Sequence, residues 1–289
     1  MTGMACSERE LRGMAKGVIL CRDAGTLDRA SSVGATRILC LSDLHIPFNL
    51  PIEQIRGVGR VDVLVLNGDI VDCYALSKFP KEYHLSPVDE MIKAREYLID
   101  LINAVKPKRV IANYGNHEAR FASYLKRNIS EDMRELLPDT PLDYIFDRGF
   151  TRDNKQTGVS TYYAPISTVF QDIEIFFTHN WWTRVGKTVF AHPLAYSAQA
   201  LKTADKMVAF LHATVRDPFD AVVIGHTHRS AEGKHGYIHV YEQGAMCDVN
   251  AMRYADGKLQ QPMQKGYVLI VQDEDGNIMP DASKRYVIE

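Results

Sequence analysis

The stretch Val222–His228 reads VVIGHTH, an apolar run that stops at a glycine and then presents two histidines spaced two residues apart. A strand that ends in a surface loop explains this pattern. A strand whose carboxyl end holds His226 and His228 as metal ligands explains it equally well. A single stretch cannot separate these interpretations, so the test is whether the chain repeats the arrangement elsewhere.

The composition of the chain is that of an ordinary globular protein. Its 289 residues are 46% hydrophobic and 24% charged, with a formal net charge of -2, so no protein-wide basic surface for polyanions is expected. Five cysteines are scattered and form no CxxC pair, which indicates neither a disulfide framework nor a thiolate zinc site. No signal-peptide core and no stretch of membrane-spanning length occurs, so we expect a cytoplasmic protein without membrane contact.

Short apolar runs alternate with helical patterns from about residue 36 onward. The runs that predict strands are Ile38–Leu41, Val61–Leu66, Arg109–Ala112, Ile173–Phe177 and Ala221–Ile224, followed by Tyr237–Tyr241 and Tyr267–Val271. Their nearly continuous apolar content is typical of strands that are buried on both faces. Strands that alternate with helices predict one layered α/β domain over residues 36–289.

Two helices and an N-terminal extension complete the predicted organisation. Ser86, followed by a proline, is a candidate N-cap for a helix that Pro107 closes. A second helix is predicted over residues 194–213, directly before VVIGHTH. Residues 1–35 lack a clear strand pattern, and apolar residues recur at helical spacing over 11–19. We expect a helical extension that packs on the main domain or on another subunit of a homo-oligomer.

The arrangement of VVIGHTH is repeated along the chain, because polar residues follow each of the five strands. These blocks are Asp43-Leu44-His45, Gly68-Asp69, Gly115-Asn116-His117-Glu118, His179 and Gly225-His226-Thr227-His228. The carboxyl ends of strands in such sheets form the usual site of chemistry. The repetition therefore favours the metal site over the surface loop.

The residue types in these blocks suit a pair of divalent ions. Imidazole nitrogen mixed with carboxylate and amide oxygen is typical of sites for Mn, Fe or Zn. Asp43 and His45 are two apart, so an extended turn can point both at one ion. Gly68, Gly115 and Gly225 allow tight turns and close backbone approach. Neither a G-x-S-x-G nucleophile elbow nor a GxxxxGK[ST] phosphate loop occurs.

The blocks D-x-H, G-D, G-N-H-[DE], H and G-H-x-H, in this order, resemble those of the calcineurin-like metallophosphoesterase family. The resemblance extends from about Thr36 to the strands near Val271. It implies a four-layer αββα sandwich of two mixed sheets flanked by helices. It also implies two divalent ions at one sheet edge, for which we expect Mn²⁺, with Fe, Zn, Ni or Mg as alternatives.

The resemblance assigns a role to each block. One ion would be held by Asp43, His45, Asp69 and His228, and the other by Asp69, Asn116, His179 and His226. Asp69 would bridge the two ions. His117 matches the histidine that lies beside the scissile phosphate without binding metal. Two ions roughly 3.5–4 Å apart would activate water and stabilise both ends of an in-line displacement.

Residues next to the blocks are weaker candidates. Arg120 and Arg229 directly follow blocks and are candidates for contacts to phosphate oxygens, although Arg229 also fits a solvated loop charge. Trp181 is a candidate for stacking on a base, with core packing or subunit contact as the more common use. Glu118 is expected to support the ligands without binding metal. The histidines that match no block, expected on the surface or in the core and with a minor substrate role for His192 as the alternative, are His84, His192, His212, His235 and His239.

The substrate class depends on one departure from a related pattern. Protein Ser/Thr phosphatases carry a phosphate-binding arginine where GDIVDCYAL has Cys73, so tight recognition of a phosphomonoester is not expected. The GNHE-x-R and GHTHR blocks look more like bacterial and phage nuclease-like phosphoesterases. We therefore expect a phosphodiesterase that acts on DNA, RNA or nucleotides, with residues 130–168 as a cap over the site.

Two alternatives remain open. One is a phosphomonoesterase of small phosphates or phosphoproteins. The other is a non-catalytic binding module on the same fold, as in the retromer subunit that resembles these enzymes, which is recognised by eroded metal ligands.

Overall fold

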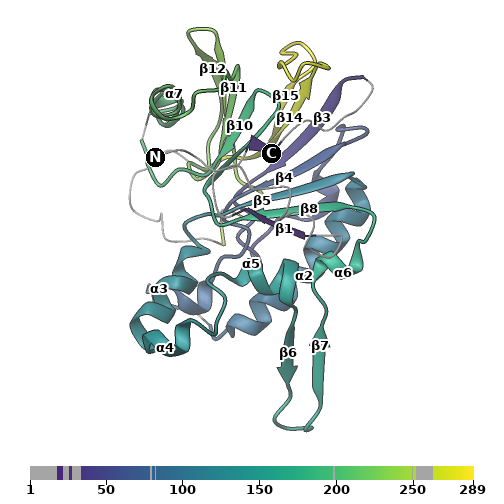
Figure 1. Cartoon of the computed structure of the whole chain (residues 1–289), viewed down its shortest axis with the longest axis vertical. Helices are drawn as coiled ribbons and strands as arrows, with labels where there is room; N and C mark the ends of the chain where they lie inside the picture. Colours follow the sequence, from purple (N-terminus) through teal and green to yellow (C-terminus); the bar gives the residue numbers. More distant parts are fainter. Residues whose placement is uncertain are drawn as a thin grey trace.

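The computed structural model describes residues 18–21, 26–27, 34–78, 80–81, 83–197, 199–248, 250–251 and 263–289. These residues form two large sheets and a separate hairpin (Figure 1). The seven-stranded sheet of the described residues has the order β1 (Val18–Cys21), β8 (Glu174–Thr178), β5 (Arg109–Asn113), β4 (Val63–Asn67), β3 (Thr36–Leu41), β14 (Lys265–Gln272), β15 (Lys284–Ile288). Their six-stranded sheet has the order β12 (Ser230–His235), β13 (Ile238–Gln243), β11 (Ala221–Ile224), β10 (Thr188–Ala191), β9 (Trp182–Val185), β2 (Thr26–Leu27).

The helices lie outside the two sheets. The longer ones are α2 (Pro87–Val105), α3 (Ala119–Asn128) and α7 (Lys202–Thr214). Short helical segments are η1 (Ile52–Gln54), η2 (Tyr74–Leu76), α4 (Glu131–Arg134), α5 (Pro141–Asp143), the π-helical η3 (Tyr144–Arg148) and α6 (Ile166–Val169). No helix within the described ranges is both long and apolar enough to cross a membrane.

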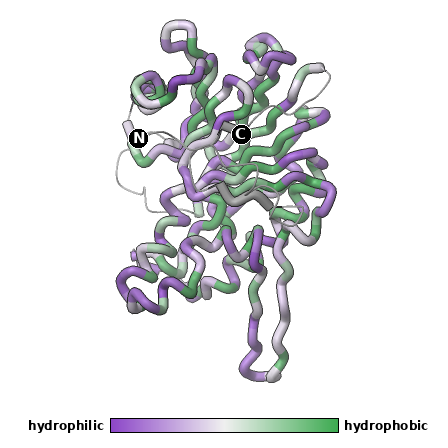
Figure 2. Tube along the Cα trace, in the orientation of Figure 1, coloured by the Kyte–Doolittle hydropathy of each residue, from purple (hydrophilic) through white to green (hydrophobic). Residues whose placement is uncertain are grey.

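Four layers follow from the alternation of side chains along the strands. In β3, Leu39 and Leu41 belong to the core shared with α2, whereas Ile38 and Cys40 belong to the core between the two sheets. The outer face of the six-stranded sheet packs against α7. Figure 2 shows that hydrophobic residues concentrate in the strands, while α3 and α4 are mainly hydrophilic. Both sheets contain parallel and antiparallel pairs, so the predicted αββα sandwich of two mixed sheets is confirmed.

Most predicted elements appear within one or two residues of their expected bounds. The Ser86 hydroxyl accepts a hydrogen bond from Asp89 N at 3.1 Å, which confirms the cap of α2. The helix predicted to begin at residue 194 was wrong at its start, since α7 begins at Lys202 after Leu201 in a left-handed conformation (φ 62°). The end of the predicted N-terminal helix was also wrong, because Val18–Cys21 pairs in parallel with β8. The rest of that predicted helix lies outside the described residues.

The strands that precede the sequence blocks end at one edge. In the seven-stranded sheet, β8, β5, β4 and β3 are successive parallel neighbours, so their carboxyl ends coincide. Buried amides join this edge to the other sheet: Asn67 donates to Ala191 O at 3.0 Å and Asn113 donates to Phe190 O at 3.1 Å. The ends of β10 and β11 are thereby held against the ends of β4 and β5.

The segment predicted as a cap contains the hairpin of β6 (Phe150–Asp153) and β7 (Ser160–Tyr163). Figure 1 shows this hairpin extending away from the two sheets. Asp143, from the same segment, instead contacts His179 after β8. A capping role for residues 130–168 stays a prediction.

Candidate metal centre

The residues after β3, β4 and β11 adopt an unusual backbone conformation. Asp43, His45, Asp69, His226 and His228 all have positive φ, between 45° and 72°. Side chains other than glycine rarely take this left-handed conformation, which costs about 1–3 kcal/mol per residue and persists where the surrounding structure enforces it. Such residues cluster at functional sites.

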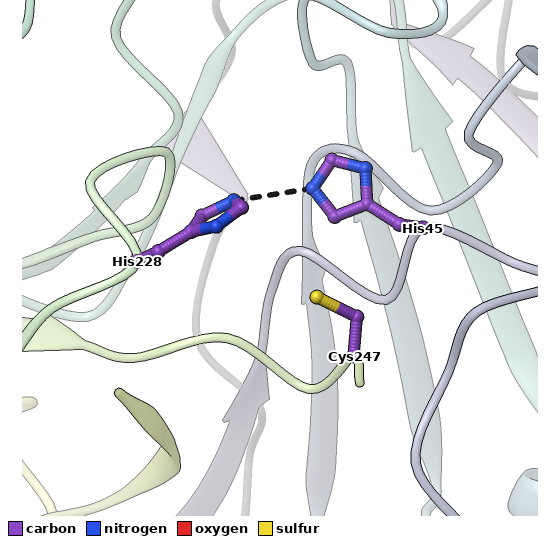
Figure 3. Close-up of side chains that lie close together, drawn as sticks. All are labelled: His45, His228 and Cys247. Atoms are coloured by element: carbon purple, nitrogen blue, oxygen red, sulfur yellow. Dashed lines mark hydrogen bonds between the residues drawn. The ribbon is translucent and has the colours of Figure 1, made fainter. Parts of the chain in front are cut away.

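A first group of donor atoms forms where β3 and β11 end. His45 Nε2 lies 3.2 Å from His228 Nε2 (Figure 3). His228 Nε2 also lies 3.0 Å from Asp43 Oδ1. Asp69 Oδ2 lies 3.8 Å from His45 Nε2. Two ligand atoms that are each about 2.0–2.2 Å from one ion lie roughly 3–4 Å apart. The spacing of this group therefore fits a single ion.

A second group shares Asp69 with the first. His192 Nε2 lies 3.2 Å from Asp69 Oδ2, and donor atoms of Asp69, His192 and His226 all lie within 4.8 Å of one another. The Nδ1 atom of His192 contacts Asn67 O at 2.8 Å, which fixes the proton there and leaves Nε2 to face Asp69. Asp69 thus faces both groups, as a bridging ligand must.

Several buried donor atoms in these groups have no hydrogen-bond partner among the described residues. They are Asp43 Oδ1, Asn116 Oδ1 and His192 Nε2. Asp43 Oδ1 lies 3.0 Å from His228 Nε2, and His192 Nε2 lies 3.2 Å from Asp69 Oδ2. Buried polar atoms are normally satisfied, so buried carboxylate, amide and imidazole atoms without a hydrogen bond at these strand ends fit the ligands of a cation.

The local electrostatics also favour cations. Burial lowers the pKa of His45, but the neighbouring carboxylates of Asp43 and Asp72 outweigh this effect and raise that pKa to about 10. Burial also lowers the pKa of His192, but the charges of Asp69 and Asp43 outweigh this effect and raise that pKa to about 9. Without metal, the carboxylates therefore hold protons on these imidazoles. A divalent ion would supply the positive charge instead, releasing the protons.

Asp72 contacts two histidines of the site, His45 and His117, and orients both rings. Its Oδ1 lies 3.0 Å from His45 Nδ1 and 2.9 Å from His117 Nδ1. The first contact turns His45 Nε2 toward the metal position, in the carboxylate–histidine–metal arrangement. The second leaves His117 Nε2 to face Asp69 Oδ2, at 3.8 Å, and Arg120, whose Nη2 donates to it at 2.9 Å.

Glu118 ties the loop after β4 to the loop after β5. Its buried carboxylate accepts hydrogen bonds from the backbone N–H groups of Asp69, Ile70, Val71 and Gly115 at 2.7–3.1 Å. A Cβ at Gly115 would lie 2.2 Å from Asp69 N, so only glycine permits this approach. Glu118 thus supports the ligands from behind.

Three other predicted site residues, His179, Trp181 and Arg229, contact residues outside the two donor groups. His179 Nε2 lies 2.9 Å from Asp143 Oδ1, and within the described part of the chain His179 is absent from the groups of converging donors. Trp181 packs against Phe210 and the core around α7. Arg229 is buried, and its Nη2 donates to Tyr196 Oη at 3.0 Å. Contacts of Trp181 and Arg229 with a substrate stay predictions.

The sequence matches a known protein family over the range that contains these residues. Residues 36–230 match the model of the calcineurin-like phosphoesterase family, which is more than half of the chain. The chain belongs to the calcineurin-like phosphoesterases. The range includes every residue of the two donor groups, from Asp43 to His228. No curated protein matches significantly.

Several solved structures resemble the chain at low sequence identity. A metallophosphoesterase from Sphaerobacter thermophilus is 15% identical, with a TM-score of 0.42, over 88% of each chain. An archaeal phosphodiesterase is 15% identical, with a TM-score of 0.37, over 88% of this chain and 100% of that one. Vacuolar protein sorting 29 from Cryptosporidium parvum is 12% identical, with a TM-score of 0.41, over 83% and 86%.

Three residues of this calcineurin-like phosphoesterase site escaped the sequence reasoning. Asp72 carried a signal, since it lies three residues after Asp69 in the same block. His192 follows the four-residue strand β10, which is too short to stand out as an apolar run. Cys247 follows no predicted strand, and its position depends on a loop that folds back on the site.

Proposed function

We propose that this protein is a dinuclear metal-dependent phosphodiesterase that acts on nucleic acids or nucleotides. The convergence of imidazole and carboxylate donors on two adjacent points, with Asp69 facing both, carries the proposal. The proposed ligands are Asp43, His45, Asp69 and His228 for one ion and Asp69, Asn116, His192 and His226 for the other. The convergence of imidazole and carboxylate donors at both positions supports an enzyme over a non-catalytic binding module.

When bound, two divalent ions would lower the pKa of a water molecule and stabilise charge on the phosphoryl oxygens. The mixed nitrogen and oxygen donors suit Mn²⁺, with Fe, Zn, Ni or Mg as alternatives. The chain's own task is to fix the donor atoms, and it does so through Asp72, Asn67 and Glu118 behind the ligands.

His117 is the proposed proton donor to the departing oxygen. Its side chain is only 6% exposed, and Nε2 faces Asp69 while Asp72 holds Nδ1. Arg120 Nη2 donates to this Nε2 at 2.9 Å. A bound phosphate oxygen would offer the guanidinium a charged acceptor. We propose that Arg120 then turns to the phosphate and leaves His117 Nε2 to carry the proton.

The preference for diesters rests on the position after Asp72. Cys73 is buried, and burial raises the pKa of its thiol well above the usual range, so it offers a phosphate no positive charge. A bidentate guanidinium favours a dianionic monoester more than a monoanionic diester. The absence of an arginine at this position therefore weakens the binding of a diester less than the binding of a monoester.

The proposed function predicts faster hydrolysis of bis-p-nitrophenyl phosphate than of p-nitrophenyl phosphate. Both substrates release the same phenolate, so the comparison isolates the number of ester bonds. Rates would be measured on the full chain with added Mn²⁺, with a metal count on the same sample. A monoesterase rate well above the diesterase rate would refute the diester preference, and the absence of both activities in the metal-loaded protein would refute the enzyme.

The ligand assignment predicts different results for two histidines. His192→Ala should lower the bound Mn²⁺ to about half, because it removes one of the two groups of donors. His179→Ala should retain both ions, because His179 pairs with Asp143. Metal would be counted by elemental analysis after gel filtration. If His179→Ala loses metal and His192→Ala retains it, the ligand is His179, as the sequence predicts, and the assignment of His192 is refuted.

A further inference from the structure

Cys247 lies beside the first metal position. Its sulfur and one ring nitrogen of each of His45 and His228 all lie within 4.8 Å of one another. Figure 3 shows the Cys247 sulfur below the two imidazoles, pointing toward the space between them. The Cys247 side chain is fully buried. A sulfur in this place is not part of the ligand pattern that the sequence blocks describe.

The backbone on both sides of Cys247 is held against the loop after β3. Met246 N donates to Ser42 O at 3.0 Å, and Asp248 N donates to Phe48 O at 2.7 Å. Cys247 is therefore fixed relative to the turn that carries His45. The sulfur needs no rearrangement of the chain to remain next to the ligands.

An independent feature indicates that a cation belongs here. Asp43 Oδ1 is fully buried, lies 3.0 Å from His228 Nε2 and has no hydrogen-bond partner in the described part of the chain. The ordinary role of a buried cysteine is packing, and Cys247 does pack with Ala245 and Phe48. Packing explains its burial, but it does not explain a sulfur within 4.8 Å of ring nitrogens of both His45 and His228.

We propose that the sulfur of Cys247 is an additional ligand of the ion held by Asp43, His45 and His228. Ligands at about 2.1 Å for nitrogen and 2.3 Å for sulfur are at most about 4.4 Å apart, so the observed spacing needs only a small contraction. Coordination would release the thiol proton to solvent. Sulfur favours soft ions, so this position would select Zn²⁺, Co²⁺ or Cd²⁺ over Mn²⁺. The inference rests on the proposed metal centre.

Cobalt binding tests the sulfur ligand directly. The metal-free full chain would be titrated with Co²⁺, and a sulfur-to-cobalt charge-transfer band in the near ultraviolet is expected. Cys247→Ser should lose this band while it still binds Co²⁺. Cys40→Ser is the matched control, because Cys40 is also buried but its sulfur contacts Gln243 Oε1 at 3.0 Å. That variant should keep the band.

Affinity gives a second readout. Loss of even an outer partner of a metal ligand typically costs about 10–100-fold in affinity. Cys247→Ser should therefore raise the Kd for Cd²⁺ by about tenfold or more, with a smaller change for Mn²⁺. If this variant fails to fold, X-ray absorption at the zinc edge of the wild-type protein replaces it, with sulfur expected at about 2.3 Å.

The outcomes separate the sulfur ligand from the metal centre. Stoichiometric Co²⁺ without the charge-transfer band, or zinc with only nitrogen and oxygen neighbours, would overturn the role of Cys247 and leave the proposed function standing. A wild-type protein that binds neither ion would overturn both.

Discussion

Replacement of Asp69 by asparagine is expected to remove most of the bound metal and at least about 10²–10³-fold of the activity. Asp69 Oδ2 faces both donor groups, at 3.8 Å from His45 Nε2 and 3.2 Å from His192 Nε2. An amide cannot supply the negative charge that screens two cations from each other. Metal ions contribute several kcal/mol of transition-state stabilisation, and each 1.36 kcal/mol corresponds to a tenfold change in rate.

The variant should still fold, because an asparagine oxygen can keep the hydrogen bond that Asp69 Oδ1 accepts from His117 N at 2.8 Å. Asp62→Asn is the matched control. Asp62 is also a buried carboxylate next to β4, but it pairs with Arg60 and Lys108 at the other end of the strand. The metal content of both variants would be measured by elemental analysis, and their diesterase rates would be compared with that of the wild-type protein. Full metal content and full activity in Asp69→Asn would rule out a bridging role.

His117→Asn is expected to separate natural substrates from activated ones. General acid catalysis typically contributes about 10²–10⁴-fold, and it matters most for a poor leaving group. p-Nitrophenolate leaves without a proton, whereas the alkoxide of a ribose or deoxyribose does not. The variant should therefore lose little on bis-p-nitrophenyl phosphate and about 10²–10⁴-fold on a dinucleotide.

Metal content distinguishes this role from that of a ligand. His117→Asn should keep both ions, because the proposed ligand sets do not include His117. His235→Asn is the control, since the His235 side chain is 45% exposed and pairs with Asp205. Equal losses on both substrates would indicate charge stabilisation in place of proton donation. Loss of metal would show that His117 is a ligand.

The strands and the positions of most proposed ligands could be predicted because their signals are local. A continuous apolar run such as that of β3 predicts a buried strand, and the first polar residues after it must lie at the strand's end. Asp43, His45, Asp69, His226 and His228 are all of this kind, and the structure brings them together. The helix α2 could also be predicted from the sequence, because its N-cap and the proline that closes it lie next to its ends.

The choice between His179 and His192 could not be made in this way. Both follow short strands and both have the same chemistry, but β8 belongs to the seven-stranded sheet and β10 to the other. The longer apolar run before His179 made His179 the predicted ligand, whereas the structure places His192 beside Asp69. The pairing of β10 with β11 in the six-stranded sheet brings His192 beside His226, and the pairing of two strands that a helix separates is not a local property of the sequence.

The sequence by itself determined the fold class, the family and the edge at which the chemistry lies, since these depend on strand patterns and on residues adjacent to the strands. Tertiary structure alone decided that Asp72 supports His45 and His117, that His192 faces Asp69, and that Cys247 lies against the first metal position. These contacts join residues that are far apart along the chain. The Asp72 contacts arise because β3, β4 and β5 are neighbours in one sheet, and the contact of His192 with Asp69 arises because the two sheets pack face to face.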